Sequence, residues 1–205
     1  MMKNYWILLL FTFSIVACKN NDQSTAPADS EAVPKEKEPK SYLPIVSFIN
    51  EDIRNVDAFA AGILLKTKTG QNTDSIFIKP EEFKNIAREF LAPELDSAVF
   101  HNEFTEESIA EQATQTVNFI YTSNNDKTIL RKAIVYASPS QANHKVSRIY
   151  MEKEKKSGDT TIKQKLTWRI NQYFIITEIR QTTQGFNSVI TRKAIWDPQL
   201  YADQE

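Results

Sequence analysis

Hydrophobic side chains recur at helical spacing in the chain between residues 42 and 93. The first group repeats every three or four positions, with members Ile45, Ile49, Ile53, Val56 and Ala60. This stripe predicts an amphipathic helix with one buried side. The charged residues are expected to lie largely on its opposite, polar side: Glu51, Asp52, Arg54 and Asp57. A second helix is predicted to begin at Pro80, with Glu81 and Glu82 where the helix dipole favours acids, and to stop at Pro93.

Shorter signals surround the second helix. A short apolar run covers residues 62–65, a turn is predicted at Gly70, and residues 75–78 have the composition of a brief strand. A third, weaker helix is predicted to begin near Thr105 and to cover Glu106 to Gln112.

The second half of the chain alternates between hydrophobic and polar residues, which is the period of a strand with one buried face. Six strands are predicted, approximately at residues 115–121, 129–137, 145–154, 162–170, 173–182 and 188–196. The connections are short and therefore predict antiparallel hairpins, since a parallel pair needs a crossover of a dozen or more residues. The expected fold class is α+β, with N-terminal amphipathic helices packed on one face of a roughly six-stranded antiparallel meander sheet.

The first 17 residues predict a secretory signal peptide. Lys3 precedes an apolar run from Tyr5 to Val16. That run is shorter than the roughly 20 apolar residues that span a bilayer, and its length behind a positive charge is typical of a signal sequence.

The segment Ile15-Val16-Ala17-Cys18 resembles the lipobox of bacterial lipoproteins. The resemblance implies that Cys18 is lipidated and becomes the first residue after cleavage, so that the protein is anchored to a membrane without spanning it. Lys19 differs from the Asp that marks inner-membrane retention in well-studied lipoproteins, and by the same resemblance the outer membrane of the cell envelope is the expected location. Cys18 is the only cysteine, and no thiol is then left for catalysis or metal binding.

Residues 18–41 predict a disordered tether behind the lipidated cysteine, because the segment is rich in Pro and charge and has no aromatic side chain before residue 42. Residues 42–205 are then expected to form one domain. A chain of this length buries enough surface to fold stably without disulfide bonds.

The net charge of −1 averages two unlike regions. Residues 42–126 carry 6 Lys and Arg against 14 Asp and Glu, whereas residues 127–196 carry 14 against 4. The candidate basic surface on the predicted strands consists of Arg131, Lys132, Arg148, Lys163, Lys165, Arg169, Arg192 and Lys193. One explanation is structural, because strand lysines resist edge aggregation and a basic sheet pairs well with acidic helices. The functional explanation is contact with an anionic envelope component or protein partner. No nucleic acid is expected in this compartment.

Catalytic signatures are sparse, and we expect no enzyme, metal or cofactor. His101 and His144 lie far apart and have no partner histidine at helical spacing, and the few glycines form no phosphate-binding loop. Paired acids occur at Glu81/Glu82, Glu106/Glu107 and Glu152/Glu154, where helix capping or strand exposure explains them better than glycoside hydrolysis.

Two functions remain open at this point. The first is a non-catalytic binding or assembly lipoprotein whose basic sheet contacts an anionic envelope partner. The alternative is a periplasmic carrier of an amphiphilic or lipid ligand between a curved sheet and the helices. An enclosed apolar cavity favours the carrier, and a filled core under a basic face favours the binding protein.

Overall fold

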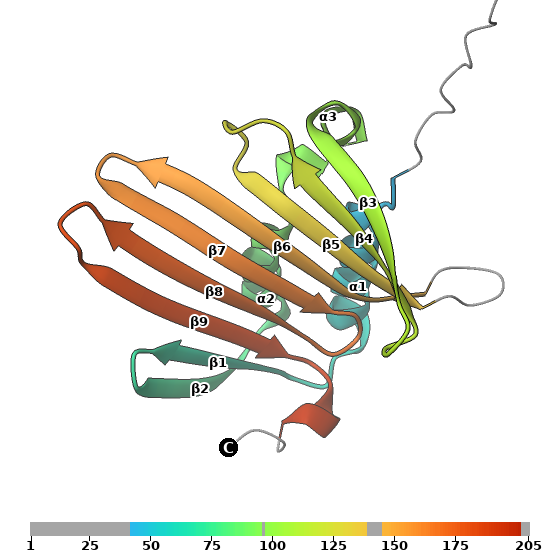
Figure 1. Cartoon of the computed structure of the whole chain (residues 1–205). Coiled ribbons are helices and arrows are strands. Elements are labelled where there is room, and N and C mark those ends of the chain that lie inside the picture. Colours follow the sequence, from blue (N-terminus) through green and yellow to red (C-terminus); the bar gives the residue numbers. More distant parts are fainter. Residues whose placement is uncertain (1–41, 96, 139–144, 202–205) are drawn as a thin grey trace, which may run out of the picture. The chain divides into compact units, whose positions relative to one another are not determined.

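The computed structural model describes residues 42–95, 97–138 and 145–201. The predicted signal peptide, Cys18, the predicted tether and His144 lie outside the described residues. Within them, a single antiparallel sheet of nine strands dominates (Figure 1). Its strands are β1 (Ile63–Thr69), β2 (Asn72–Ile78), β3 (Phe104–Glu111), β4 (Thr116–Ser123), β5 (Leu130–Ser138), β6 (Lys145–Ser157), β7 (Thr160–Arg169), β8 (Tyr173–Thr182) and β9 (Asn187–Ile195).

The strand order is β2-β1-β9-β8-β7-β6-β5-β4-β3. Strands β3 to β9 form a meander in which each strand pairs with the next along the chain, and the β1–β2 hairpin extends the sheet beyond β9. The two edges are therefore β2 and β3, both from the first half of the chain.

The predicted fold class is wrong: the domain is mainly a nine-stranded antiparallel sheet with few helices, in place of helices on a roughly six-stranded meander. The six predicted strands correspond to β4 to β9, and the brief strand predicted at residues 75–78 falls within β2, whereas β1 and β3 were not predicted as strands. Strand β1 continues the apolar run at 62–65 through Lys66 and Lys68, and its pairing with β9 supplies the hydrogen bonds that a short isolated hairpin lacks.

The third predicted helix is also wrong. Residues Phe104–Glu111 form strand β3, which pairs along its whole length with β4. Glu106, Glu107, Ala110 and Glu111 favour a helix by intrinsic propensity, but the continuous ladder with β4 overrides that local preference. Because β3 is an edge strand, Glu107 and Glu111 remain solvent exposed.

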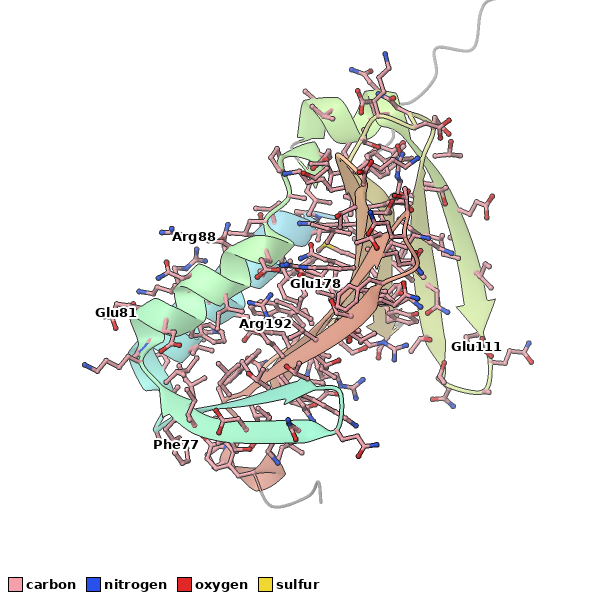
Figure 2. The ribbon with its side chains drawn as sticks, turned by 90° about the vertical axis from the view of Figure 1, so that its left-hand side faces the viewer. Phe77, Glu81, Arg88, Glu111, Glu178 and Arg192 are labelled. Carbon is pink, nitrogen blue, oxygen red and sulfur yellow. The ribbon has the colours of Figure 1, made fainter. Side chains whose placement is uncertain are left out.

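The first two predicted helices are confirmed as elements. Helix α1 covers Ile45–Phe59 and α2 covers Pro80–Ala87. Both lie on one side of the sheet (Figures 1 and 2). The remaining helical elements are short: η1 (Arg88–Phe90), η2 (Pro93–Leu95), α3 (Ser97–Glu103) and η3 (Pro198–Leu200).

The helix-covered face of the sheet, here the inner face, carries the hydrophobic core. One row of directly paired residues crosses all nine strands: Ile76, Leu65, Ala194, Phe174, Trp168, Ile149, Val135, Phe119 and Ser108. Its central members are fully buried. Phe83 of α2 and Phe90 of η1 pack against Trp168 and Phe174, with ring centroids 4.9–6.2 Å apart. This interdigitation fixes the helices on the sheet.

Polar contacts tie the helices to the same face. Glu89 of η1 accepts hydrogen bonds from Arg192 (2.7 Å) and from Gln164 (2.9 Å). Gln164 also donates to Glu178 at 3.0 Å. Figure 2 shows Arg192 and Glu178 between the sheet and the helices.

Asp52 corrects a further prediction. The helical pattern placed it on the polar side of α1, yet its side chain is only 2% exposed. Residue 52 follows Ile49 by three positions and precedes Val56 by four, which is the spacing of the buried stripe.

Candidate functional site

The outer face, the sheet face that points away from the helices, is the candidate functional surface. Side chains alternate between faces along a strand, so the residues next to the buried inner row point outward. Six of the eight predicted cations lie on this face: Lys132, Arg148, Lys163, Lys165, Arg169 and Lys193. The sheet therefore gathers residues from β5, β6, β7 and β9 on one surface.

Arg192 and Arg131 do not belong to the outer face. Arg192 points to the helices, where its guanidinium forms an ion pair with Glu89 at 2.7 Å. Arg131 lies in a register shift between Leu130 and Lys132, and it donates a hydrogen bond to the backbone oxygen of Asn125 at 3.2 Å. Both arginines therefore stabilise the domain internally.

Further cations on the outer face were missed, among them two on β1. Lys66 and Lys68 alternate with threonines on β1, and Lys66 lies directly opposite Lys193 of β9. The pattern Lys-Thr-Lys-Thr before Gly70 was the available signal, because it has the period of a strand.

Arg148 and Arg169 form the least compensated part of the outer face. They are direct neighbours on β6 and β7, a placement that is unfavourable for like charges without an anion. The Arg148 guanidinium lies 3.7 Å from the centre of the Tyr136 ring. Its Nε is buried and has no hydrogen-bond partner among the described residues. Arg169 donates from Nε to Gln172 at 3.2 Å.

A groove of about 290 Å³ lies beside this arginine pair. The end of the β3–β4 hairpin forms one side of the groove, and strands β5, β6 and β7 form the other. Its lining is almost wholly polar: Glu111, Thr114, Thr116, Asn118, Tyr136, Ser147, Arg148 and Arg169. We refer to it as the arginine groove. Two guanidinium groups with hydroxyl and amide neighbours suit a carboxylate or phosphate group.

At the other end of the outer face, lysines alternate with acids. Glu152 lies between Lys132 and Lys165 in one cross-strand row, and Tyr150 donates a hydrogen bond to Glu152 at 2.7 Å. In the next row Lys163 is 3.9 Å from Glu154. Alternating charges of this kind stabilise neighbouring strands modestly. The arginine pair, in contrast, has no acid at a paired position on the neighbouring strands, and Glu111 is the acid that lines its groove.

Lys193 is the most enclosed cation of the outer face, with 9% of its surface exposed. Its ammonium group lies 4.5 Å from the centre of the Tyr173 ring. Burial lowers the pKa of Lys193, and the positive charge of Lys66 lowers it further. A negative charge brought close to this surface stabilises the protonated, charged form of Lys193.

The remaining sequence candidates are not brought together. His101 is exposed and stacks on Tyr42, with ring centroids 4.5 Å apart. Glu81 and Glu82 lie in the first turn of α2, whereas Glu106 and Glu107 point to opposite faces of β3. Within residues 42–95, 97–138 and 145–201, no group of three His, Cys, Asp or Glu side chains is placed to hold a metal ion.

No helix in this described part of the chain is both long enough and apolar enough to cross a membrane. Neither the comparison with protein-family models nor the search of curated proteins finds a match for this chain.

Proposed function

We propose that this protein is a lipid-anchored lipoprotein of the cell envelope that binds an anionic partner without catalysis. In this proposal Cys18 holds the chain at the outer membrane, and the outer face of the sheet presents the arginine groove. The observation that carries the proposal is the direct pairing of Arg148 with Arg169 beside a polar groove. Anionic groups neutralise both guanidinium charges and satisfy the buried Nε of Arg148.

The residue types on the outer face support a binding role. Tyr136, Tyr150 and Tyr173 lie on it together with the two arginines. Tyrosine and arginine are enriched among the residues that dominate binding energy in protein interfaces. A charge-dominated contact also implies fast association that weakens as salt rises.

The core supports the binding protein over the carrier. Phe83, Phe90, Trp168 and Phe174 fill the space between the sheet and the helices with contacting rings. A lipid tail placed there has to displace this packing, which contributes several kcal/mol to the fold.

The test compares two double variants that remove the same charge from the same face. Arg148→Gln with Arg169→Gln alters the arginine groove, and Lys163→Gln with Lys165→Gln alters the compensated end. The purified proteins are applied to an immobilised acidic polysaccharide, and separately to an envelope extract, in a salt series. Screening is weak near about 0.1 M salt and strong near about 1 M, where the Debye length is roughly 10 Å and 3 Å.

We expect the arginine variant to lose at least about tenfold in low-salt binding, and the lysine variant to lose less than about threefold, since each lost charge-assisted contact is worth about 1.5–3 kcal/mol. Equal losses in the two variants indicate a diffuse charge effect and contradict the groove. Binding that is insensitive to both salt and the arginine variant refutes the anionic partner.

A further inference from the structure

A second candidate site lies around Asp52, on the side of the sheet that carries the helices. The Asp52 carboxylate is buried between α1 and the β7–β8 turn. Its Oδ2 accepts a hydrogen bond from Trp168 Nε1 at 2.7 Å and another from the backbone N–H of Asn171 at 3.0 Å. Asn171 adopts a positive φ of 61°, and this hydrogen bond holds the turn against the helix.

The second carboxylate oxygen, Oδ1, does not take part in these hydrogen bonds. Oδ1 is buried and has no hydrogen-bond partner among the described residues. Such an oxygen normally has a partner, because an unsatisfied buried acceptor is costly, and a charged one more so. Burial accordingly raises the pKa of Asp52, and the hydrogen bond from Trp168 only partly opposes the shift.

The hydrogen bonds to Oδ2 do not by themselves require a carboxylate. An asparagine at this position accepts from the same two donors through its carbonyl oxygen and buries no charge. The negative charge and the unpartnered Oδ1 are what the aspartate adds.

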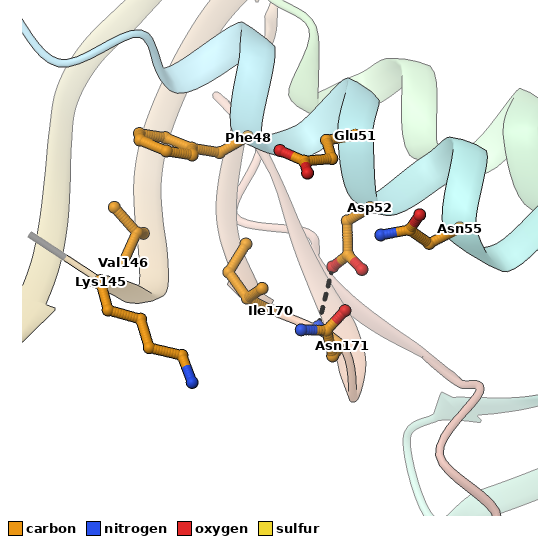
Figure 3. A pocket seen from close by; sticks show the side chains of 8 residues that line it. All are labelled: Phe48, Glu51, Asp52, Asn55, Lys145, Val146, Ile170 and Asn171. Atoms are coloured by element: carbon orange, nitrogen blue, oxygen red, sulfur yellow. Dashed lines mark hydrogen bonds between the residues drawn. The ribbon is translucent and has the colours of Figure 1, made fainter. Parts of the chain in front are cut away.

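Two hollows adjoin this carboxylate and share Asp52, Asn55 and Asn171. The first, of about 220 Å³, is drawn in Figure 3 and is completed by Phe48, Glu51, Lys145, Val146 and Ile170. The second, of about 320 Å³, is completed by Val56, Phe59, Ala60 and Trp196. In Figure 3 the carboxylate oxygen that is not bonded to Asn171 lies on the side of Asn55. We call the second hollow the Asp52 pocket.

The lining of the Asp52 pocket combines one acid, two amides and an apolar rim. No cation lines it among the described residues. Phe59 is 84% exposed although its ring is apolar, and the second aromatic residue of the lining is Trp196. Acceptors at the centre with aromatic carbon around them match an alkyl chain that ends in a positive charge.

We propose that the Asp52 pocket binds a primary ammonium group on an alkyl stem, as in an alkylamine or a lysine side chain. The ammonium group donates to Asp52 Oδ1 and neutralises the buried charge, and the stem lies against Phe59 and Trp196. This site is separate from the arginine groove, is of opposite charge, and does not depend on the proposed function.

Trp168 supplies a direct reporter for this proposal. It is one of three tryptophans in the chain, and its indole N–H is bonded to the same carboxylate that the ligand contacts. The experiment follows the tryptophan indole signals of the purified, ¹⁵N-labelled protein by NMR at about pH 8, where carboxyls and amines are both mostly charged. A Trp168→Phe variant assigns the signal.

Three probes are titrated: pentylamine, N-acetyl-lysine amide and 1-pentanol. We expect a saturable shift of the Trp168 indole signal with pentylamine and none with 1-pentanol. A matching shift with N-acetyl-lysine amide shows that the pocket accepts a peptide lysine, and its absence shows that the pocket accepts only the free amine. A pentanol shift equal to that of pentylamine, or no saturable shift with either amine, overturns the proposal.

Two variants control for charge. Asp52→Asn keeps the acceptor for Trp168 but removes the negative charge, and we expect at least a tenfold loss of pentylamine affinity. Glu51→Gln removes the same charge from the neighbouring position of α1, and we expect less than a threefold loss. Equal losses mean that only the general acidity of α1 attracts the amine, and this result also overturns the proposal.

Discussion

Neighbouring residues along each strand of the sheet point to opposite faces. The inner row runs through Trp168 and Ile149, and the adjacent residues on the same two strands, Arg169 and Arg148, are paired in the same way on the outer face. The inner pair is fully buried under the helices, whereas the outer pair borders a polar groove. One register therefore fixes both the core and the arginine pair, so that a change in strand pairing disturbs both together. The inner face stabilises the fold, and the outer face is free to carry a binding surface.

Trp168→Ala is the change with the largest expected effect on this comparison. It leaves a cavity among Phe83, Phe90 and Phe174 and removes a hydrogen bond to Asp52. We expect a loss of about 3–5 kcal/mol in the free energy of unfolding, measured by urea denaturation.

The matched control is Thr167→Ala, the preceding residue on the outer face, for which we expect a change of no more than about 0.5–1 kcal/mol. A Trp168→Phe variant separates the lost N–H from the lost volume. Comparable losses for Trp168→Ala and Thr167→Ala contradict the assignment of stability to the inner face.

Asp52 carries a buried charge on the helix side of the sheet. Burial raises the pKa of Asp52 above its ordinary value of 3.8. As pH rises through that value, the unfolded chain releases this proton first, and the native state releases it only at the raised pKa. The native protein therefore loses stability over this window, by at most about 1.4 kcal/mol per pH unit.

Asp52→Asn removes this titration. We expect its free energy of unfolding to increase relative to that of the original protein as pH rises above about 4. Urea unfolding of the two proteins between about pH 3 and pH 7 measures the difference. A constant difference over that range contradicts the raised pKa.

The sequence predicted the strands of the second half because alternation and turn residues there agree. The turn residues between β6 and β7 also indicate which residues of the two strands pair, including Arg148 and Arg169. The hairpin β6–β7 turns through two residues, Gly158 and Asp159, and Gly158 has the positive φ of 56° that such turns need. Counting outward from that turn places Arg148 opposite Arg169.

The rest depended on contacts that local pattern does not encode. Strand β3 has a helix-favouring sequence and is a strand only because β4 offers it a full ladder. The burial of Asp52 depends on how α1 crosses the β7–β8 turn, and the Asp52 pocket follows from the same packing. Long-range packing of this kind decides between local preferences that are close in energy.

The smallest expected change in stability belongs to Arg169→Gln, and it tests whether the arginine pair serves binding or the fold. Arg169 faces Arg148 across the strands, and it donates a part-buried hydrogen bond to Gln172. Removing the like charge relieves repulsion, so we expect the free energy of unfolding to stay within about 0.5 kcal/mol or to rise slightly at low salt. Anion binding by the same variant is expected to fall clearly, because one of the two guanidinium donors is lost.

Arg192→Gln is the matched control on the inner face, where Arg192 forms an ion pair with Glu89. We expect its loss to lower the free energy of unfolding by about 1–3 kcal/mol and to leave anion binding unchanged. If Arg169→Gln destabilises the protein as much as Arg192→Gln does, the arginine pair is a structural feature, and the division of roles between the two faces fails.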